Sequence, residues 1–247
     1  MSFREISAMA NIMLRKCMNS KNGDLLKEVF QAALGTHGEK QHSSDTGTGP
    51  ANALIVAAHD GQETMLRLLI DSKGAVDVVN QHDQTPLFLA AREGHSACVQ
   101  ILIDAKAPLE VKDQFGNTPL AMAAWRGHNS VIQKLIAAGA DVNVTNSDQQ
   151  TPLYHVAFHN NSTGAKALIK AGAKLDIQNK EGDTAFKIAT MRGHVAMMRL
   201  LIAEKADINL CNFEHQTPLR SAMDLGSGRS RLASGLWRRC QHHRRRR

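Results

Sequence analysis

The sequence predicts an all-α solenoid of helix-turn-helix units that are joined by short β-hairpin-like turns. The main observation is an internal repeat, in which five successive intervals of 33 residues separate copies of one short motif. The motif is Thr-Pro-Leu or a close variant of it, and its copies begin at Asn52, Thr85, Thr118, Thr151, Thr184 and Thr217. Aromatic residues make up only 4% of the chain, so the core is expected to consist of aliphatic and small side chains that allow close helix packing.

One unit shows why the motif predicts two helices. The side chain of Thr85 can cap the free amides of a helix, and Pro86 occupies the first helical position, where a missing N–H is harmless. Ala90 and Ala91 lie on one face of this first helix. Gly94 follows where the helix ends, because glycine readily adopts the left-handed conformation found there. A second amphipathic helix and a polar turn complete the unit.

The unit at 118–150 reads TPLAMAAWRGH and later LIAAGADVN. This pattern, with its 33-residue period, resembles the ankyrin repeat. The resemblance covers residues 52 to about 224, and it implies a stack that binds partners through a concave groove and turn tips. The fourth motif position, where the family has a His that bonds the Thr, departs from the pattern in every unit and holds Phe88, Ala121, Tyr154, Lys187 and Arg220.

Four segments are expected along the chain. Residues 1–34 have the apolar spacing of a degenerate N-terminal capping repeat, and residues 35–50 are a polar, Gly-rich flexible insertion. Residues 51–224 form the ankyrin repeat stack, with five full units and a truncated sixth. Residues 225–247 form a disordered Arg-rich tail, because Ser and Arg stand where the second helix of the sixth unit needs apolar residues.

The basic character of the chain comes from that tail. The net charge is +7, but residues 225–247 contain eight Arg and no acidic residue, which leaves −1 for the rest. The tail is either an unstructured end or a functional basic segment that binds nucleic acid or an acidic partner. The near-neutral repeats argue against nucleic acid binding elsewhere in the chain.

Catalytic, cofactor and membrane functions have no support in the sequence. No apolar run reaches the roughly 18 residues that a membrane span requires. The four cysteines are scattered without a CxxC pair, which favours a cytoplasmic, or nuclear, location. No phosphate-binding loop is present. His155 and His159 have metal-ligand spacing but lack a third ligand, and Asp45-Thr46-Gly47 lies in a polar loop without the strands of an aspartic protease. We therefore expect no enzyme, no metal and no small-molecule substrate.

A protein-binding scaffold is the predicted function, with exposed side chains at the ends of the first helices and at the turn tips. Trp125 is the central residue, because its helical phase directs it away from the Leu/Ala face. An exposed Trp beside Arg has the composition of a binding hot spot; the alternative is that these side chains pack sideways between units. The candidate residues are Arg92, Phe115, Trp125, Arg126, Phe158, His159, Met191, Arg192 and Phe213.

Asn143 and Asn209 each follow an Asp-Val or Asp-Ile pair and have a Leu eight positions upstream. This looks like the pattern that an oxygen-dependent asparaginyl hydroxylase modifies in many ankyrin proteins. The alternative is a structural role, in which each Asn hydrogen-bonds the turn.

Overall fold

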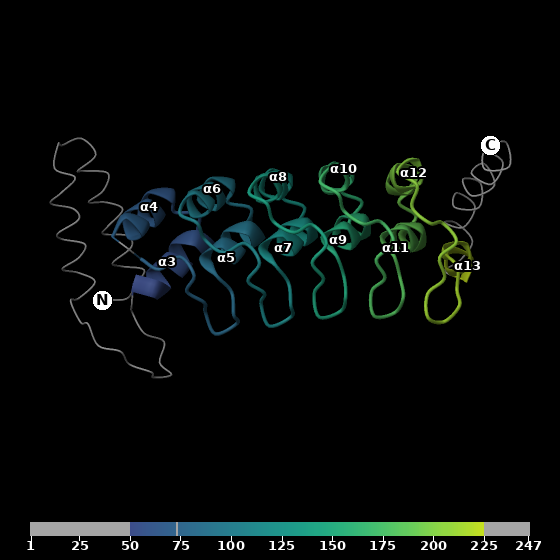
Figure 1. Ribbon diagram of the computed structural model, residues 1–247, viewed down its shortest axis with the longest axis horizontal. Coiled ribbons are helices and arrows are strands. Elements are labelled where there is room, and N and C mark those ends of the chain that lie inside the picture. Colours follow the sequence, from purple (N-terminus) through teal and green to yellow (C-terminus); the bar gives the residue numbers. More distant parts are fainter. Residues whose placement is uncertain (1–49, 73, 225–247) are drawn as a thin grey trace.

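The computed structural model describes residues 50–72 and 74–224, which form a row of stacked helix pairs (Figure 1). All regular elements in these ranges are helices, and no strand occurs among them. This confirms the predicted all-α solenoid. The capping repeat expected at 1–34, most of the insertion at 35–50 and the tail at 225–247 lie outside the described residues, as does Asp45-Thr46-Gly47.

The helices lie in two rows, with the turns forming a third row beyond the first helices (Figure 1). We call the first helix of each unit the inner helix and the second the outer helix. The inner helices are α3 (Pro50–His59), α5 (Pro86–Glu93), α7 (Pro119–Arg126), α9 (Pro152–Phe158), α11 (Ala185–Arg192) and α13 (Pro218–Asp224). The outer helices are α4 (Glu63–Asp71), α6 (Ser96–Asp104), α8 (Asn129–Ala137), α10 (Ser162–Lys170) and α12 (Val195–Ala203).

Each motif Thr caps its inner helix. The Oγ1 atom of Thr85 accepts a hydrogen bond from the Phe88 N–H at 3.1 Å, and the other motif threonines repeat this bond. It satisfies one of the amides that a helix start leaves without a partner. The cap therefore forms in the five units from Thr85 to Thr217 although the family's fourth-position His is absent.

One continuous apolar core runs through the stack. The motif Leu is almost fully buried in α3, α5, α7 and α9, as are the Ala or Val residues one turn later. The outer helices contribute a second column of buried residues, which consists of Leu69, Leu102, Leu135, Leu168 and Leu201. Because each unit buries its apolar face only against its neighbours, the stability of the stack comes from unit-to-unit interfaces.

Histidines at the start of the outer helices tie neighbouring units together. The Nε2 atom of His128 lies 3.0 Å from the Arg92 carbonyl oxygen, and His95 and His194 make the same contact with His59 and Phe158. In the unit from Thr151 this position is Asn161, which bonds the Asn129 side chain at 2.8 Å instead. The Trp125 carbonyl oxygen, the equivalent acceptor, consequently receives no hydrogen bond from the described residues.

Two further series of hydrogen bonds connect the units. A side chain in the loop after α6, α8 and α10 accepts a bond from a backbone N–H of the next unit, as Glu110 does from Asp141 and Asp176 from Asp207. The turns are bonded by their backbones, and Ser147 N–H donates to the Phe115 carbonyl oxygen at 2.9 Å. The equivalent turn bonds join Gln114 to His82, Lys180 to Asp148 and Phe213 to Glu181.

The fourth motif position holds a buried charge in one unit. Lys187 is only 1% exposed, and its Nζ atom lies 2.6 Å from Oδ1 of Asp183, which precedes the motif. Tyr154 of the preceding unit is near the same carboxylate: burial and the charge of Asp183 raise its pKa to about 12. The ion pair therefore spans the start of α11 and faces the neighbouring unit.

Candidate functional site

The last residues of the inner helices, with the residue that directly follows α3 and α9, form a row along one side of the stack. We call this the helix-end row, and it consists of His59, Asp60, Arg92, Glu93, Trp125, Arg126, Phe158, His159, Met191 and Arg192. The row follows from the repeat, because each inner helix ends at the same place in its unit. Its members differ in exposure and charge, and the structure brings only some of them together.

Aromatic side chains gather at the middle of the row. Trp125 is 38% exposed, and its ring centroid lies 5.2 Å from Phe158 and 4.5 Å from His159. The Phe158 ring is tilted by 34° to the indole, whereas His159 meets it edge-on. We call Trp125, His155, Phe158, His159 and Arg192 the Trp125 cluster.

Arg192 extends the cluster to the next unit. Its guanidinium carbon lies 3.5 Å from the centroid of the Phe158 ring, an attractive cation–π arrangement. Arg192 itself is exposed. Stacking restrains the guanidinium plane but leaves its N–H groups at the edge of that plane, where a carboxylate can bond them in pairs.

His155 forms the floor of the cluster. Its side chain is 3% exposed, its ring centroid lies 5.3 Å from that of Trp125, and Nδ1 has no hydrogen-bond partner among the described residues. Burial lowers the pKa of His155 to about 4. Partial burial, and the charge of Arg192, also lower the pKa of His159. Both imidazoles are therefore neutral at physiological pH, and the positive charge here comes from arginine.

Charges along the helix-end row are distributed unevenly. In the first two units each carboxylate has a partner, because Glu93 lies 2.6 Å from Arg92 Nε and Asp60 lies 2.7 Å from His59 Nδ1. Although burial acts to raise it, the hydrogen bond from Arg92 holds the pKa of Glu93 below its usual value. Arg126 and Arg192 are exposed and have no ion-pair partner among the described residues. Exposed positive charge thus lies beside Trp125 and Phe158, although the charge of Arg126 also contributes to the lowered pKa of Glu93.

The remaining candidate residues lie apart from the cluster. Phe115 is 70% exposed and Phe213 is 64% exposed, but they stand on different turns with two other turns between them. Met191 is half-buried and packs against the apolar core. Of the nine predicted residues, the structure therefore joins Trp125, Phe158, His159 and Arg192 by ring contacts.

No metal or catalytic centre stands out in the described part of the chain. Residues 50–72 and 74–224 contain no group of three His, Cys, Asp or Glu side chains that is placed to hold a metal ion. Cys98 is fully buried, and burial raises the pKa of its thiol to about 11, which makes it a poor nucleophile. None of the helices in these residues is long and apolar enough to cross a membrane.

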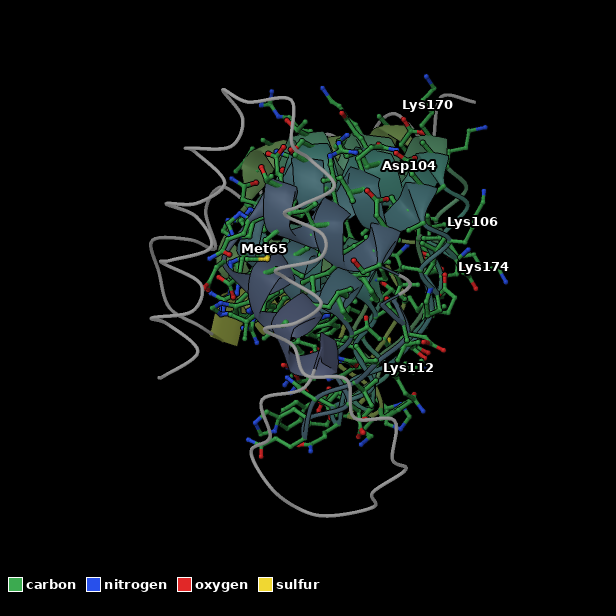
Figure 2. The ribbon with its side chains drawn as sticks, turned by 90° about the vertical axis from the view of Figure 1, so that its left-hand side faces the viewer. Met65, Asp104, Lys106, Lys112, Lys170 and Lys174 are labelled. Atoms are coloured by element: carbon green, nitrogen blue, oxygen red, sulfur yellow. The ribbon has the colours of Figure 1, made fainter. Side chains whose placement is uncertain are left out.

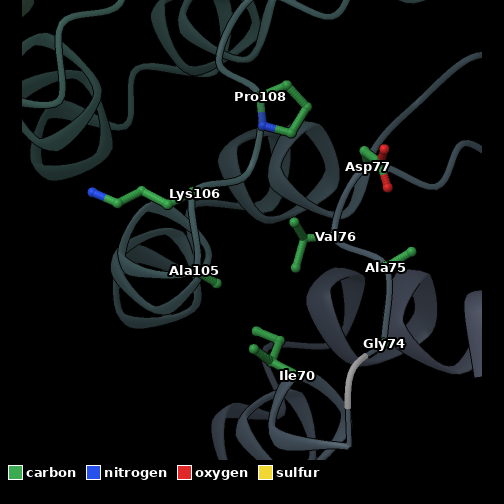
Figure 3. A pocket seen from close by; sticks show the side chains of 8 residues that line it. All are labelled: Ile70, Gly74, Ala75, Val76, Asp77, Ala105, Lys106 and Pro108. Atoms are coloured by element: carbon green, nitrogen blue, oxygen red, sulfur yellow. The ribbon is translucent and has the colours of Figure 1, made fainter.

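A hollow of about 600 Å³ opens between α4 and α6, on the side away from the helix-end row (Figure 3). Pro108 lines it and stands where later units supply the N–H that a side chain of the preceding unit bonds. Ile70 and Val76 face each other in the hollow, while Lys106 and Asp77 point to opposite sides (Figure 3). The arrangement lacks converging polar groups of the kind that orient a small ligand.

Lysines are distributed along the edge of the stack that carries the loops after the outer helices. Lys106, Lys170 and Lys174 project there into solvent (Figure 2). Carboxylates lie among them, including Asp104 and Asp176. Because both signs alternate, this edge has the composition of an ordinary solvated surface.

Asn143 has a structural role. Its Oδ1 accepts a hydrogen bond from the Lys174 N–H at 2.7 Å, and its Nδ2 donates to the Gly172 carbonyl oxygen at 3.3 Å. These bonds belong to the series that links each unit to the next. Asn209 occupies the same position one period after Asp176 and is exposed. Hydroxylation of Asn143 or Asn209 stays a prediction.

Comparison with known families agrees with the geometry. The family described as Ankyrin repeats (3 copies) matches residues 16–113, 104–179 and 155–233. The chain belongs to the ankyrin repeat family. No curated protein sequence gives a significant match. Ankyrin repeats are in general protein–protein interaction modules and typically have no enzymatic activity, so the helix-end row of this ankyrin stack is the first surface to consider for a partner.

Sequence reasoning missed two members of the site. His155 was assigned no role beyond an ordinary helix residue, yet it is the buried floor beneath Trp125. Asn161 was not considered, although it leaves the Trp125 carbonyl open. Aligning the units would have shown both, because Leu89, Met122 and Ile188 occupy the position of His155, and His95, His128 and His194 that of Asn161.

Proposed function

We propose that this ankyrin repeat protein is a non-catalytic scaffold that binds a partner protein through the Trp125 cluster. The observation that carries the proposal is the exposed indole of Trp125, which contacts Phe158 and His159 on the next unit. Aromatic and Arg side chains that are preorganised by such contacts dominate the binding energy of many protein interfaces.

The contacts of the cluster supply this preorganisation. Phe158 lies between Trp125 and Arg192, so the three side chains restrain one another before any partner arrives. Less conformational entropy is then lost on binding. The turn tips with Phe115 and Phe213 are exposed apolar contacts beyond the cluster, and we assign them a secondary role.

Capture of partners with the full chain, followed by titration of a purified partner, tests the proposal. Trp125→Ala is expected to weaken binding about 30-fold or more, which corresponds to roughly 2 kcal/mol at a central aromatic anchor. Arg199→Ala, on the exposed face of α12, is the control and should leave the affinity unchanged. Unchanged binding by a folded Trp125→Ala protein, as judged by circular dichroism, would contradict the assignment.

Binding through the Arg-rich tail is the rival function. It rests on the charge of residues 225–247, and such binding is largely electrostatic and falls steeply with salt. Removal of residues 225–247 separates the two, because binding through the Trp125 cluster should survive this deletion.

A further inference from the structure

Resting on the partner-binding role proposed above, we propose that the Trp125 cluster recognises an extended peptide segment that carries carboxylates beside an apolar side chain. The apolar side chain packs on Trp125, the carboxylates bond Arg126 and Arg192, and a peptide N–H bonds the Trp125 carbonyl oxygen. Three features of the structure lead to this assignment, the second and third of which both follow from Asn161 in place of a histidine.

The first feature is the charge that the stack leaves unpaired. In the first two units the arginine of the helix-end row has a carboxylate partner, because Arg92 Nε lies 2.6 Å from Glu93, and the second carboxylate, Asp60, lies 2.7 Å from His59 Nδ1. Arg126 and Arg192 have no carboxylate partner within the described residues and lie on either side of the cluster along the row. Because His155 and His159 are neutral at physiological pH, these two guanidinium groups determine the local charge, which favours an acidic partner.

The second feature is an open backbone acceptor. Three equivalent carbonyl groups, those of His59, Arg92 and Phe158, accept a bond from the histidine found 36 residues later. Asn161 replaces that histidine beside Trp125 and turns its amide to Asn129. A hydrogen-bond acceptor therefore remains beside the exposed indole, where the main chain of a bound peptide can supply the donor.

The third feature is the space that the missing imidazole leaves. A Cβ atom placed on Gly94 would meet the His128 ring at 2.7 Å, and one on Gly61 would meet His95 at 2.7 Å. At Gly127, which follows α7, the nearest atom would be the Asn161 amide nitrogen at 3.9 Å. The region next to the Trp125 carbonyl is thus more open than the corresponding regions of the first two junctions.

The acidic side chains on the turn tips favour a peptide over a nucleic acid as the partner. Exposed Glu181 and Glu214 stand on the turn tips of the same half of the stack, together with Asp148, which pairs with Lys180 at 3.6 Å. A polynucleotide carries one negative charge at every phosphate, so its backbone would meet these carboxylates. A peptide can place its carboxylates over the two arginines alone and keep uncharged residues near the turns.

The experiment selects binders and then changes the site. A library of random short peptides displayed on phage is panned against the full chain, and the selected peptides are synthesised and titrated. Peptides whose affinity is unaffected by Trp125→Ala bind elsewhere, including at the Arg-rich tail, and are set aside.

We expect the Trp125-dependent peptides to be acidic and to contain an apolar residue. The double variant Arg126→Glu/Arg192→Glu should weaken their binding at least about tenfold. Arg199→Glu, which makes the same charge change on α12, should change the affinity less than about twofold.

Asn161→His tests the backbone acceptor. In this variant the imidazole should bond the Trp125 carbonyl as His128 bonds that of Arg92, and peptide affinity should fall about fivefold, the loss of one hydrogen bond. The inference would be overturned if Asn161→His left the peptide affinity unchanged. It would also be overturned if the Trp125-dependent peptides bound the Arg126→Glu/Arg192→Glu variant as tightly as the wild type. Neither result would contradict the partner-binding role. If no selected peptide depends on Trp125, the proposed function fails as well. Binding of poly(U) that needs Arg126 and Arg192 but not Arg199 would instead make the cluster a nucleic-acid surface.

Discussion

The units from Thr118 and Thr151 have the same fold but differ in sequence around the Trp125 cluster. The first has Met122 on its inner helix and Gly127 and His128 after it, whereas the second has His155, Asn160 and Asn161 at these positions. The turn before the first contains Gly116, whereas the turn before the second contains Gln149 at the same position, with φ of 58°. All of these changes lie in or next to the unit that supplies Phe158 and His159 to the Trp125 cluster.

The comparison shows that connections between ankyrin units are redundant. The apolar core, the loop side-chain bonds and the turn bonds all continue across the junction between these units. Loss of one histidine bond is therefore compatible with an intact stack, and the groups that this loss frees become available to a partner. The following predictions test this comparison at individual residues.

Acid should destabilise the folded chain because His155 is buried as a neutral imidazole. The folded chain binds a proton at His155 only near pH 4, whereas an unfolded His binds it below about pH 6.5. The free energy of unfolding should therefore fall as the pH drops from about 6.5 to 4, by about 3 kcal/mol in total from this group. His155→Leu, which copies Leu89 of an earlier unit, should remove this part of the pH dependence in urea titrations. His82→Gln, on an exposed turn, is the control; an equal acid loss in the wild type and His155→Leu would show that His155 is not the responsible group.

The hydrogen bond between the histidine of one unit and the carbonyl oxygen of the preceding unit should contribute less to the free energy of unfolding than the apolar core does. His128→Ala removes the hydrogen bond to the Arg92 carbonyl oxygen and should lower the free energy of unfolding by about 1 kcal/mol. His82→Ala removes only an exposed imidazole and should leave stability unchanged within about 0.5 kcal/mol. Thermal unfolding followed by circular dichroism measures both. A loss near zero for His128→Ala would mean that the regular junctions gain nothing from the bond.

The smallest effect is expected in the turn before the unit from Thr151. Gln149 has a positive φ of 58° where the preceding turn has Gly116 at 75°, and a non-glycine residue is disfavoured there. Gln149→Gly should stabilise the protein by about 0.5 kcal/mol, since relief of the left-handed strain is partly offset by the greater freedom of glycine in the unfolded chain. The reverse change, Gly116→Ala, should destabilise, because its Cβ would lie 2.7 Å from the Ser147 nitrogen. Destabilisation by Gln149→Gly in chemical denaturation would disagree with this account.

Most of the fold could be predicted from the period alone. Helix starts follow from the motif threonines, and the exposure of Trp125 follows from its position directly after the buried pair Ala123-Ala124 of α7, because the helical rotation turns it away from their face. Period and helical phase are local properties, so a single unit is enough to derive them. They also placed Phe115 and Phe213 on exposed turn tips.

The contacts between units could not be predicted in this way. The stacking of Arg192 on Phe158 and the pairing of Asn161 with Asn129 depend on the distance and rotation between neighbouring units. The sequence period fixes neither quantity. The burial of His155 has a different origin: the residue looks like a polar position on one helix, and only the apolar residues at the aligned positions of other units, such as Leu89 and Ile188, indicate that its position is buried.

The Lys187–Asp183 pair limits how the units of this protein can be rearranged by recombination or design. Lys187 is buried beside the interface with the unit of Tyr154 and has Asp183 as its only ion-pair partner in the described chain. A unit transferred with Lys187 but cut after Asp183 would carry a buried ammonium group without its counter-ion, at a cost of several kcal/mol. Exchange points that keep residues 183–187 together should therefore be tolerated, whereas a cut at the motif threonine should not. Although the repeat is regular, the units of this chain are not interchangeable modules.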